Sequence, residues 1–298
     1  MEKNELNEQS TGQLAGSHLC MNQYKNMFKK YRKPDKLRDT QLYRNSQNCM
    51  VMCNGSFFVL NFDCDLESQI HWILNNRPEP VKSPLFTTDA RRQWFKNYHD
   101  LKKIDANKQL LAEIESAAFI VCLDRNEKDA GLEQFLHGGK LNAVNRWYDA
   151  TIQLIIDDSG QFGLCYEHSV CEGVPIINFA HHIKKGLKAT KEKYYFGMKP
   201  VQRKVLQLSQ ELETSLVRVE QSFTSLQNRL DMKVFRFSKF GKGFIKSQNM
   251  SPDAFVQVAL QLAYYEIYST LCSTYESASI RRFKKVTILI FNFSWLSL

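Results

Sequence analysis

The chain has 298 residues, of which 43% are hydrophobic and 24% are charged, and it carries a formal net charge of +9. These values are ordinary for a soluble globular protein, and the length allows one large domain or two modest ones. The basic excess favours an anionic partner, but the cations are scattered and no aromatic-interleaved RNA-binding motif accompanies them. Nucleic acid is therefore not the expected partner.

The eight cysteines predict neither a disulfide framework nor a metal site, because they form no CxxC pair and no repeated spacing. They favour a reducing compartment. Cys171 has no neighbour that would lower the pKa of its thiol, which predicts an inert side chain. The acidic, polar N-terminus is unlike a signal peptide. The apolar run over 286–298 is shorter than the roughly 20 residues that span a bilayer, so we expect no membrane span.

The first half of the sequence predicts strands mixed with helices. Two apolar runs within 50–62 are joined by Asn54-Gly55, the pair that best tolerates the positive φ angles of a type I′ turn, which predicts a β-hairpin. Helical spacing then predicts two helices, followed by a buried strand and a loop whose glycines indicate close backbone packing. These elements span residues 87–103, 107–117, 118–124 and 136–149.

The second half continues this mixture. Strand-like runs on either side of 158–161 predict another hairpin, so that His168 ends a strand. A helix with Pro175 in its first turn is expected over 174–185. Between 205 and 230, apolar residues repeat every three or four positions, which predicts one long packed helix.

Residues 232–246 alternate like a strand before two glycines. Ser251 as N-cap, Pro252 at the first helical position and Asp253 in the first turn then predict a helix up to residue 271. Because this helix is apolar nearly all round, we expect it to be buried. Strands mixed with helices throughout predict an α/β or α+β fold class.

His168 is the first candidate for chemistry. A histidine that ends a strand before the tight segment 169–173 can project its ring into a cleft, and histidine commonly serves as a general base. Glu172 could orient the ring or hold a nearby cation. The alternative is a buried histidine held by hydrogen bonds for structural reasons.

A second candidate is the segment FGKGFIKSQNMSPD, over 240–253. Its glycines let the backbone approach a ligand, and Lys242 and Lys246 lie four residues apart just before a helix N-terminus. Ammonium groups beside a helix start suit a phosphate. The alternative is a solvated loop without a ligand.

Together these motifs resemble the carnitine/choline acyltransferase family. The chain reads YEHSVCEG, FGKGFIKSQNMSPDAF and CSTYESAS in the family's order, and LCMNQY, DTQLYR, FIVCLD, LHGG and NRWYD also have family counterparts. The resemblance covers residue 11 to about residue 283. Glu172 and the VPII that follows it are most similar to carnitine acetyltransferases.

The resemblance implies a mechanism in which His168, beside Glu172, is the general base. It would take a proton from the carnitine hydroxyl, which then attacks the acetyl or short acyl thioester of coenzyme A directly. No acyl-enzyme, metal or permanently bound cofactor is implied, and acetyl-CoA is a co-substrate. The carnitine carboxylate would meet Tyr275 and Ser277. The residues implied in binding coenzyme A are Lys242, Lys246, Ser247, Ser251, Pro252, Asp253 and Ser279.

The resemblance also implies a chloramphenicol-acetyltransferase-like fold. We expect a first acyltransferase domain over 1–230, which carries His168, and the start of a second domain over 231–298. From about residue 284 the sequence departs from the family pattern, so we expect a truncated member. Such a chain would expose apolar surface through which it could associate with a partner. Its expected location is intracellular, and mitochondrial or peroxisomal by resemblance.

Two functions remain open at this point. One is an acyltransferase that uses His168. The other is a catalytically impaired relative that acts only as a coenzyme A-binding or interaction module.

Overall fold

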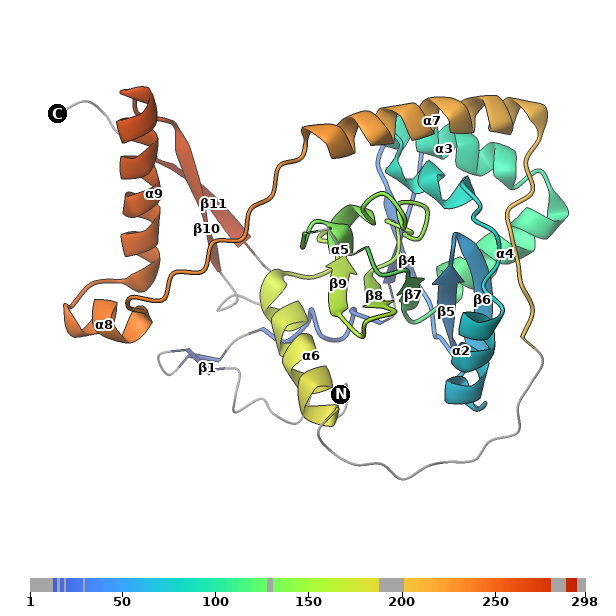
Figure 1. Cartoon of the computed structure of the whole chain (residues 1–298), viewed down its shortest axis with the longest axis horizontal. Coiled ribbons are helices and arrows are strands. Elements are labelled where there is room, and N and C mark those ends of the chain that lie inside the picture. Colours follow the sequence, from blue (N-terminus) through green and yellow to red (C-terminus); the bar gives the residue numbers. More distant parts are fainter. Residues whose placement is uncertain are drawn as a thin grey trace. The chain divides into compact units, whose positions relative to one another are not determined.

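The computed structural model describes residues 13–14, 17–18, 20–28, 30–127, 131–187, 201–279 and 288–293. The chain divides into two compact units, which we describe separately (Figure 1). Unit 1 contains the described residues of Asn22–Met232. Unit 2 contains those of Lys233–Leu298 together with those of Lys3–Met21.

Unit 1 is built on a mixed sheet with the strand order β6-β5-β7-β8-β9. The two hairpins are antiparallel, and β7 runs parallel to both of its neighbours. Asn54 and Gly55 have φ angles of 49° and 76°, which confirms the expected turn. The strands are β5 (Asn48–Cys53), β6 (Ser56–Asn61), β7 (Ile120–Asp124), β8 (Ile152–Asp157) and β9 (Phe162–Tyr166).

Helices and a smaller hairpin surround this sheet in unit 1, so the predicted mixed α/β class is confirmed (Figure 1). The expected long helix exists, with Ser209 as its N-cap. The elements are β3 (Lys30–Lys33), β4 (Thr40–Tyr43), α2 (Leu66–Asn75), η1 (Ser83–Thr88), α3 (Arg91–Leu101), α4 (Asp105–Ser116), α5 (Gln134–His137), α6 (Gly173–Gly186) and α7 (Gln210–Arg229).

Both faces of the central strand β5 are buried, because successive side chains point to opposite sides. Met50 and Met52 belong to a large apolar cluster that also contains side chains from α3, α4 and α7. Val51 belongs to a second cluster, on the opposite face, together with Ile73 of α2. The sheet is therefore enclosed by helices on both sides.

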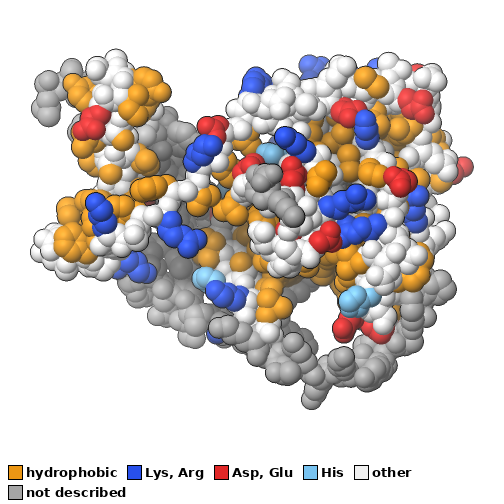
Figure 2. Space-filling view, viewed as in Figure 1, with side chains coloured by type: hydrophobic (Ala, Val, Ile, Leu, Met, Phe, Trp, Pro, Cys, Tyr) orange, Lys and Arg blue, Asp and Glu red, His pale blue; other side chains and the backbone are white. Residues whose placement is uncertain are grey.

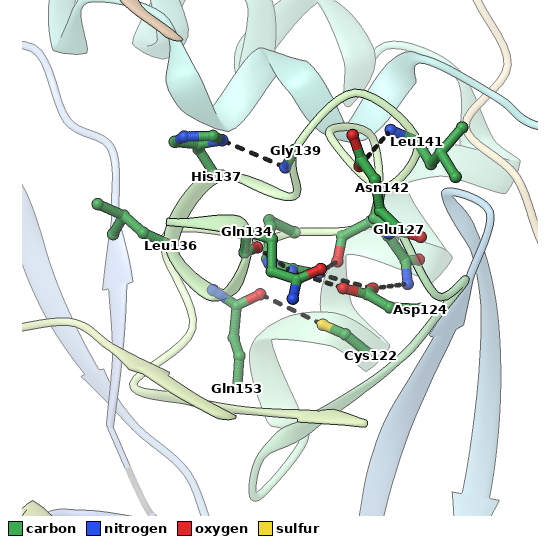
Figure 3. A network of polar contacts seen from close by, with 12 residues as sticks. Cys122, Asp124, Glu127, Gln134, Leu136, His137, Gly139, Leu141, Asn142 and Gln153 are labelled. Atoms are coloured by element: carbon green, nitrogen blue, oxygen red, sulfur yellow. Dashed lines mark hydrogen bonds and ion pairs between the residues drawn. The ribbon is translucent and has the colours of Figure 1, made fainter. Parts of the chain in front are cut away.

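The glycine-containing loop after α5 packs closely, as expected. Gly138 has a φ of 79°, and a Cβ atom there would lie 2.2 Å from the carbonyl oxygen of Asn142. Further along the same loop, the buried guanidinium of Arg146 donates to both carboxylate oxygens of Asp124, at 2.9 and 2.7 Å, and to the carbonyl of Gln134 at 2.8 Å. Figure 3 shows these two partners, Asp124 and Gln134, in the polar network around the loop. This buried, hydrogen-bonded ion pair fixes the loop against the end of β7.

In the part that the structure describes, unit 2 contains two helices and two short hairpins. Ser251 caps α9 through a hydrogen bond that its hydroxyl accepts from the backbone of Ala254, with Pro252 and Asp253 in the first turn, as predicted. No helix among the described residues is long and apolar enough to cross a membrane. The elements are β1 (Gln13–Leu14), β2 (Ser17–His18), α8 (Lys242–Ser247), α9 (Pro252–Tyr268), β10 (Thr274–Ser279) and β11 (Ile288–Phe293).

Two sequence predictions for unit 2 are wrong. Residues 232–240 do not form a strand, because no described strand pairs with their backbone, and the residues after Gly241 form the helix α8 instead. None of the described side chains of α9 is buried, although its sequence is apolar (Figure 2). An apolar pattern predicts burial only where another element covers it. The exposed apolar residues of this helix include Val256, Val258, Leu260, Leu262, Ile267 and Tyr268.

Candidate active site

His168 lies in the turn between β9 and α6. Its side chain is 64% exposed, and its Nε2 lies 3.5 Å from Oε2 of Glu172, whose side chain is only 18% exposed. The imidazole stacks on the ring of Tyr166, with centroids 5.6 Å apart. This exposure excludes the alternative of a buried structural histidine, and it leaves the ring accessible beside a carboxylate.

The turn is shaped by backbone hydrogen bonds to neighbouring segments. The N–H of Glu167 donates to the carbonyl of Thr151 at 3.0 Å, which continues the β8–β9 pairing. Glu172 is the N-cap of α6, but its own side chain does not cap the helix. Its backbone N–H instead donates to Oε1 of Gln23 at 2.9 Å, from a segment 149 positions earlier.

Glu167, directly before the histidine, is the anchor of this turn. Its Oε1 accepts from the backbone N–H of Ser169 at 3.0 Å, and its Oε2 accepts from Nη1 of Arg32 at 2.9 Å. Burial raises the pKa of Glu167, but the hydrogen bonds from Ser169 and Arg32 outweigh burial and hold its pKa below the ordinary value. Glu167 is therefore ionised at neutral pH.

Arg32 links the turn to a longer ionic network. Its Nε contacts Oδ2 of Asp39 at 2.6 Å, and the same oxygen accepts from Nε of Arg91 at 2.8 Å. Arg91 in turn contacts Asp149 at 2.6 Å, where burial raises the pKa of the carboxyl group to about 6. The network thus runs from the exposed turn to a carboxylate with no exposed surface.

Sequence reasoning assigned no role to Glu167 or Arg32. Glu167 stands beside His168 in the YEH motif, so its position was a usable signal. Arg32 lies 135 positions away from Glu167, and nothing in its local sequence indicates this contact.

Cys171 is not a candidate nucleophile. Burial, together with the nearby carboxylates of Glu172 and Glu167, raises the pKa of its thiol to about 12. The thiol therefore stays protonated at neutral pH, as expected for an inert cysteine. Within the described residues, no group of three His, Cys, Asp or Glu side chains could hold a metal ion.

The other predicted site residues belong to unit 2. Lys242 and Lys246 are exposed and lie four residues apart on α8, so they share one face of a short helix rather than a loop. Neither lysine has a carboxylate partner among the residues that the structure describes. Ser247 is also exposed, and its hydroxyl donates to the carbonyl of Phe244 at 2.7 Å.

The remaining predicted residues lie at the start of α9 and on β10. The hydroxyl of Ser251 is already used by the helix cap, whereas the Asp253 side chain is exposed. Tyr275, Ser277 and Ser279 occupy alternate positions of β10, opposite Asn292, Ile290 and Ile288 of β11. Only the backbone of these three residues is described.

Unit 1 also contains a pocket of about 690 Å³, between the loop after α5 and the C-terminal part of α7. Its lining combines cations such as Lys82 and Arg125 with the carboxylates of Glu133 and Glu220. None of the predicted site residues lines it. The chemistry that the sequence predicts is therefore not located in this pocket.

Comparisons with known proteins show which family the chain resembles. The family model described as Choline/Carnitine o-acyltransferase matches residues 1–286. Choline O-acetyltransferase of Rattus norvegicus is 36% identical over 92% of the chain. The carnitine O-acetyltransferases of Mus musculus and Columba livia are each 34% identical over 91% of it. Each alignment covers 48% of the relative, so the chain spans about half the length of the curated relatives it matches.

Proposed function

Because the chain belongs to the choline/carnitine O-acyltransferase family, we propose that it transfers an acetyl or short acyl group between coenzyme A and carnitine, with His168 as general base. The family has the chloramphenicol-acetyltransferase-like fold and uses substrates linked to coenzyme A. The observation that carries the proposal is the exposed imidazole of His168, paired with Glu172 in an anchored turn.

The proposed step is a direct transfer. The imidazole of His168 takes the proton of the carnitine hydroxyl while the hydroxyl oxygen attacks the thioester carbonyl carbon. The new C–O bond forms, the C–S bond breaks, and the imidazolium returns its proton to the coenzyme A thiolate. Glu172, at 3.5 Å from the ring, orients the imidazole for the two proton transfers. No protein nucleophile is needed, and the protonated thiol of Cys171 supplies none.

We assign the phosphates of coenzyme A to unit 2. Lys242 and Lys246 are exposed on one helix face, which suits a polyanionic ligand. The N-terminus of α9, which begins at Pro252, adds the partial positive charge of a helix start close to these lysines in sequence. The full proposed set for coenzyme A is Lys242, Lys246, Ser247, Ser251, Pro252, Asp253 and Ser279, and Tyr275 and Ser277 are proposed for the carnitine carboxylate.

Choline is the second candidate acceptor, because the choline O-acetyltransferase of Rattus norvegicus is as similar to the chain as the carnitine enzymes are. Both acceptors carry a hydroxyl group and a quaternary ammonium, and only carnitine has a carboxylate. The feature that favours carnitine is Glu172, which together with the following VPII is most similar to carnitine acetyltransferases. Parallel assays with the two acceptors distinguish them.

The proposed function is tested by thiol release from acetyl-CoA, measured with carnitine, with choline and without acceptor. Replacing His168 by alanine should lower the acceptor-dependent rate about 100- to 10,000-fold, as expected for the loss of a general base. The matched control is His182→Ala, which removes an exposed histidine from α6. Equal rates in the wild-type chain and the His168→Ala variant would overturn the role of His168.

The alternative function is a coenzyme A-binding or interaction module without turnover. It predicts that acetyl-CoA binds to the folded chain, that thiol release does not depend on acceptor, and that His168→Ala changes neither result. A Lys242→Ala and Lys246→Ala double variant should weaken binding under both functions, so only the acceptor-dependent rate separates them.

A further inference from the structure

We propose that Arg32 is a positioning residue, which holds Glu167 and, through Glu167, the turn that carries His168. The catalytic part of this inference rests on the proposed function, because it assumes that His168 reacts with a substrate. The structural part, that Arg32 orders the turn, stands on the contacts in unit 1 alone.

The contacts of the turn explain why it needs an external anchor. His168 and Ser169 lie between the end of β9 and the start of α6, where neither element's own hydrogen-bond ladder holds the backbone. Glu167 bridges this gap, because one of its carboxylate oxygens accepts from Ser169 and the other from Arg32. Without the second contact, the carboxylate would be tied only to its own turn.

Arg32 can hold this carboxylate in place because its guanidinium is itself fixed. Its Nη1 contacts Glu167 at 2.9 Å and its Nε contacts Asp39 at 2.6 Å, so two nitrogens of one rigid plane hold two carboxylates. The Glu167 side chain is only 12% exposed, which weakens solvent screening of the pair. A lysine offers a single ammonium and cannot reproduce both contacts with the same geometry.

The ionic network that holds Arg32 extends into the core of unit 1. Asp39 also accepts from Arg91 of α3, and Arg91 contacts the fully buried Asp149. The other oxygen of Asp149 accepts from the indole N–H of Trp94 at 2.6 Å, and Trp94 belongs to the large apolar cluster. The position of the turn is therefore set relative to α3 and the core, and not by β9 alone.

Two further side chains from the same N-terminal part of unit 1 support the turn. Gln41 donates to the carbonyl of Ser169 at 2.9 Å, and Gln23 accepts from the backbone N–H of Glu172 at 2.9 Å. Arg32 lies between them in sequence and is the only one of the three that is charged. The segment 23–41 thus contacts three positions of the turn. They are Glu167 directly before His168, Ser169 directly after it, and Glu172 four residues beyond it.

This arrangement predicts an effect on rate rather than on substrate binding. Arg32 does not contact His168, but a displacement of a general base by about 1 Å can lower a rate about 100-fold. Arg32→Ala should therefore lower kcat about 10- to 100-fold and leave KM for acetyl-CoA nearly unchanged. Arg32→Lys, which keeps the charge and one contact, should fall between the wild-type chain and Arg32→Ala.

The experiment combines this kinetic measurement with hydrogen exchange of the full chain, followed by mass spectrometry of peptides that cover residues 166–173. The variants are Arg32→Ala, Arg32→Lys and Glu167→Gln, of which the last keeps the shape of the side chain but removes its charge and replaces one accepting oxygen by an NH2 donor. The matched control is Arg218→Ala, which removes an arginine bonded through two nitrogens to Asp89 elsewhere in unit 1. Guanidinium ion at low concentration should partly restore kcat of Arg32→Ala, but not alter the control.

We expect faster exchange in the 166–173 peptides for Arg32→Ala and Glu167→Gln, with the exchange of this turn unchanged in Arg218→Ala. Unchanged exchange of this turn in both Arg32→Ala and Glu167→Gln would overturn the proposal. Faster exchange with unchanged kcat would overturn the catalytic part, as would an equal loss of kcat in Arg218→Ala. If the wild-type chain transfers no acyl group to any acceptor, the proposed function fails, and the exchange data still decide whether Arg32 holds the turn.

Discussion

The helices α7 and α9 have similar sequence signals and different surroundings. Both begin with a serine N-cap, and α9 is the more apolar of the two. Yet α7 buries Leu212, Leu216, Val219 and Phe223 against the core of unit 1, whereas no described residue of α9 in unit 2 is buried. The comparison shows that local sequence determines whether a helix forms, while burial depends on what packs against it.

The largest effect expected from this comparison is on core packing. Leu212 is 2% exposed and Leu260 is 62% exposed. Leu212→Ala should lower the free energy of unfolding by about 2–5 kcal/mol, because it leaves a cavity. Leu260→Ala should change it by less than about 0.5 kcal/mol, because the side chain is already in solvent.

Denaturant unfolding followed by tryptophan fluorescence measures this difference, since Trp94 and Trp147 are buried in unit 1. Equal losses for the two leucine variants would mean that α9 is covered as fully as α7 in solution.

A smaller effect is expected from the two helix caps. Ser209 and Ser251 each accept a backbone hydrogen bond at 3.4 Å, so the caps are matched in geometry. Ser209→Ala should lower the free energy of unfolding of unit 1 by about 1 kcal/mol. Ser251→Ala should fray the start of α9 and leave the unfolding of unit 1 unchanged.

Hydrogen exchange of the first turn of each helix, together with the unfolding midpoint, checks this prediction. A shift of the tryptophan-detected midpoint by Ser251→Ala as large as that by Ser209→Ala would contradict the prediction that the cap of α9 leaves the unfolding of unit 1 unchanged.

The smallest effect concerns pH and the anchored turn of unit 1. The pKa values of Glu167 and Asp39 lie below their ordinary values. The folded state therefore binds fewer protons than the unfolded state, and these pairs stabilise it at a pH above the ordinary carboxyl range of about 4–4.5. That stability is lost as the pH falls through the lowered pKa values.

Melting temperatures of the wild-type chain and Glu167→Gln, compared between pH 7 and pH 3, measure this contribution. The difference between them should be present at neutral pH and shrink on acidification. A difference that grows as the pH falls would reverse the sign that we infer. The effect on stability should be modest, because the Arg32 side chain is 30% exposed and partly screened by solvent.

Much of unit 1 could be predicted from the sequence, because its signals are local. The Asn54-Gly55 turn, the second hairpin and the capped helix α7 depend on residues that are neighbours in the chain. The expected strand over 232–240 failed because alternation specifies a strand only when a partner strand accepts its hydrogen bonds.

The candidate site was predictable only in part for the same reason. His168 and Glu172 are four residues apart, so the motif indicated that they would lie close together. The contact between Arg32 and Glu167 joins residues 135 positions apart, and the one between Gln23 and Glu172 joins residues 149 positions apart. Such contacts depend on the fold of the whole unit, and no local pattern reports them.

The most direct test of the central claim, that His168 acts as a general base in acyl transfer, is to identify the product. Wild-type chain and His168→Ala would be incubated with acetyl-CoA labelled in the acetyl group, together with carnitine or choline, and the acetylated acceptor would be measured by mass spectrometry. We predict labelled acetylcarnitine from the wild-type chain and a yield at least about 100-fold lower from the variant. Equal yields of labelled product from the two proteins would contradict the claim.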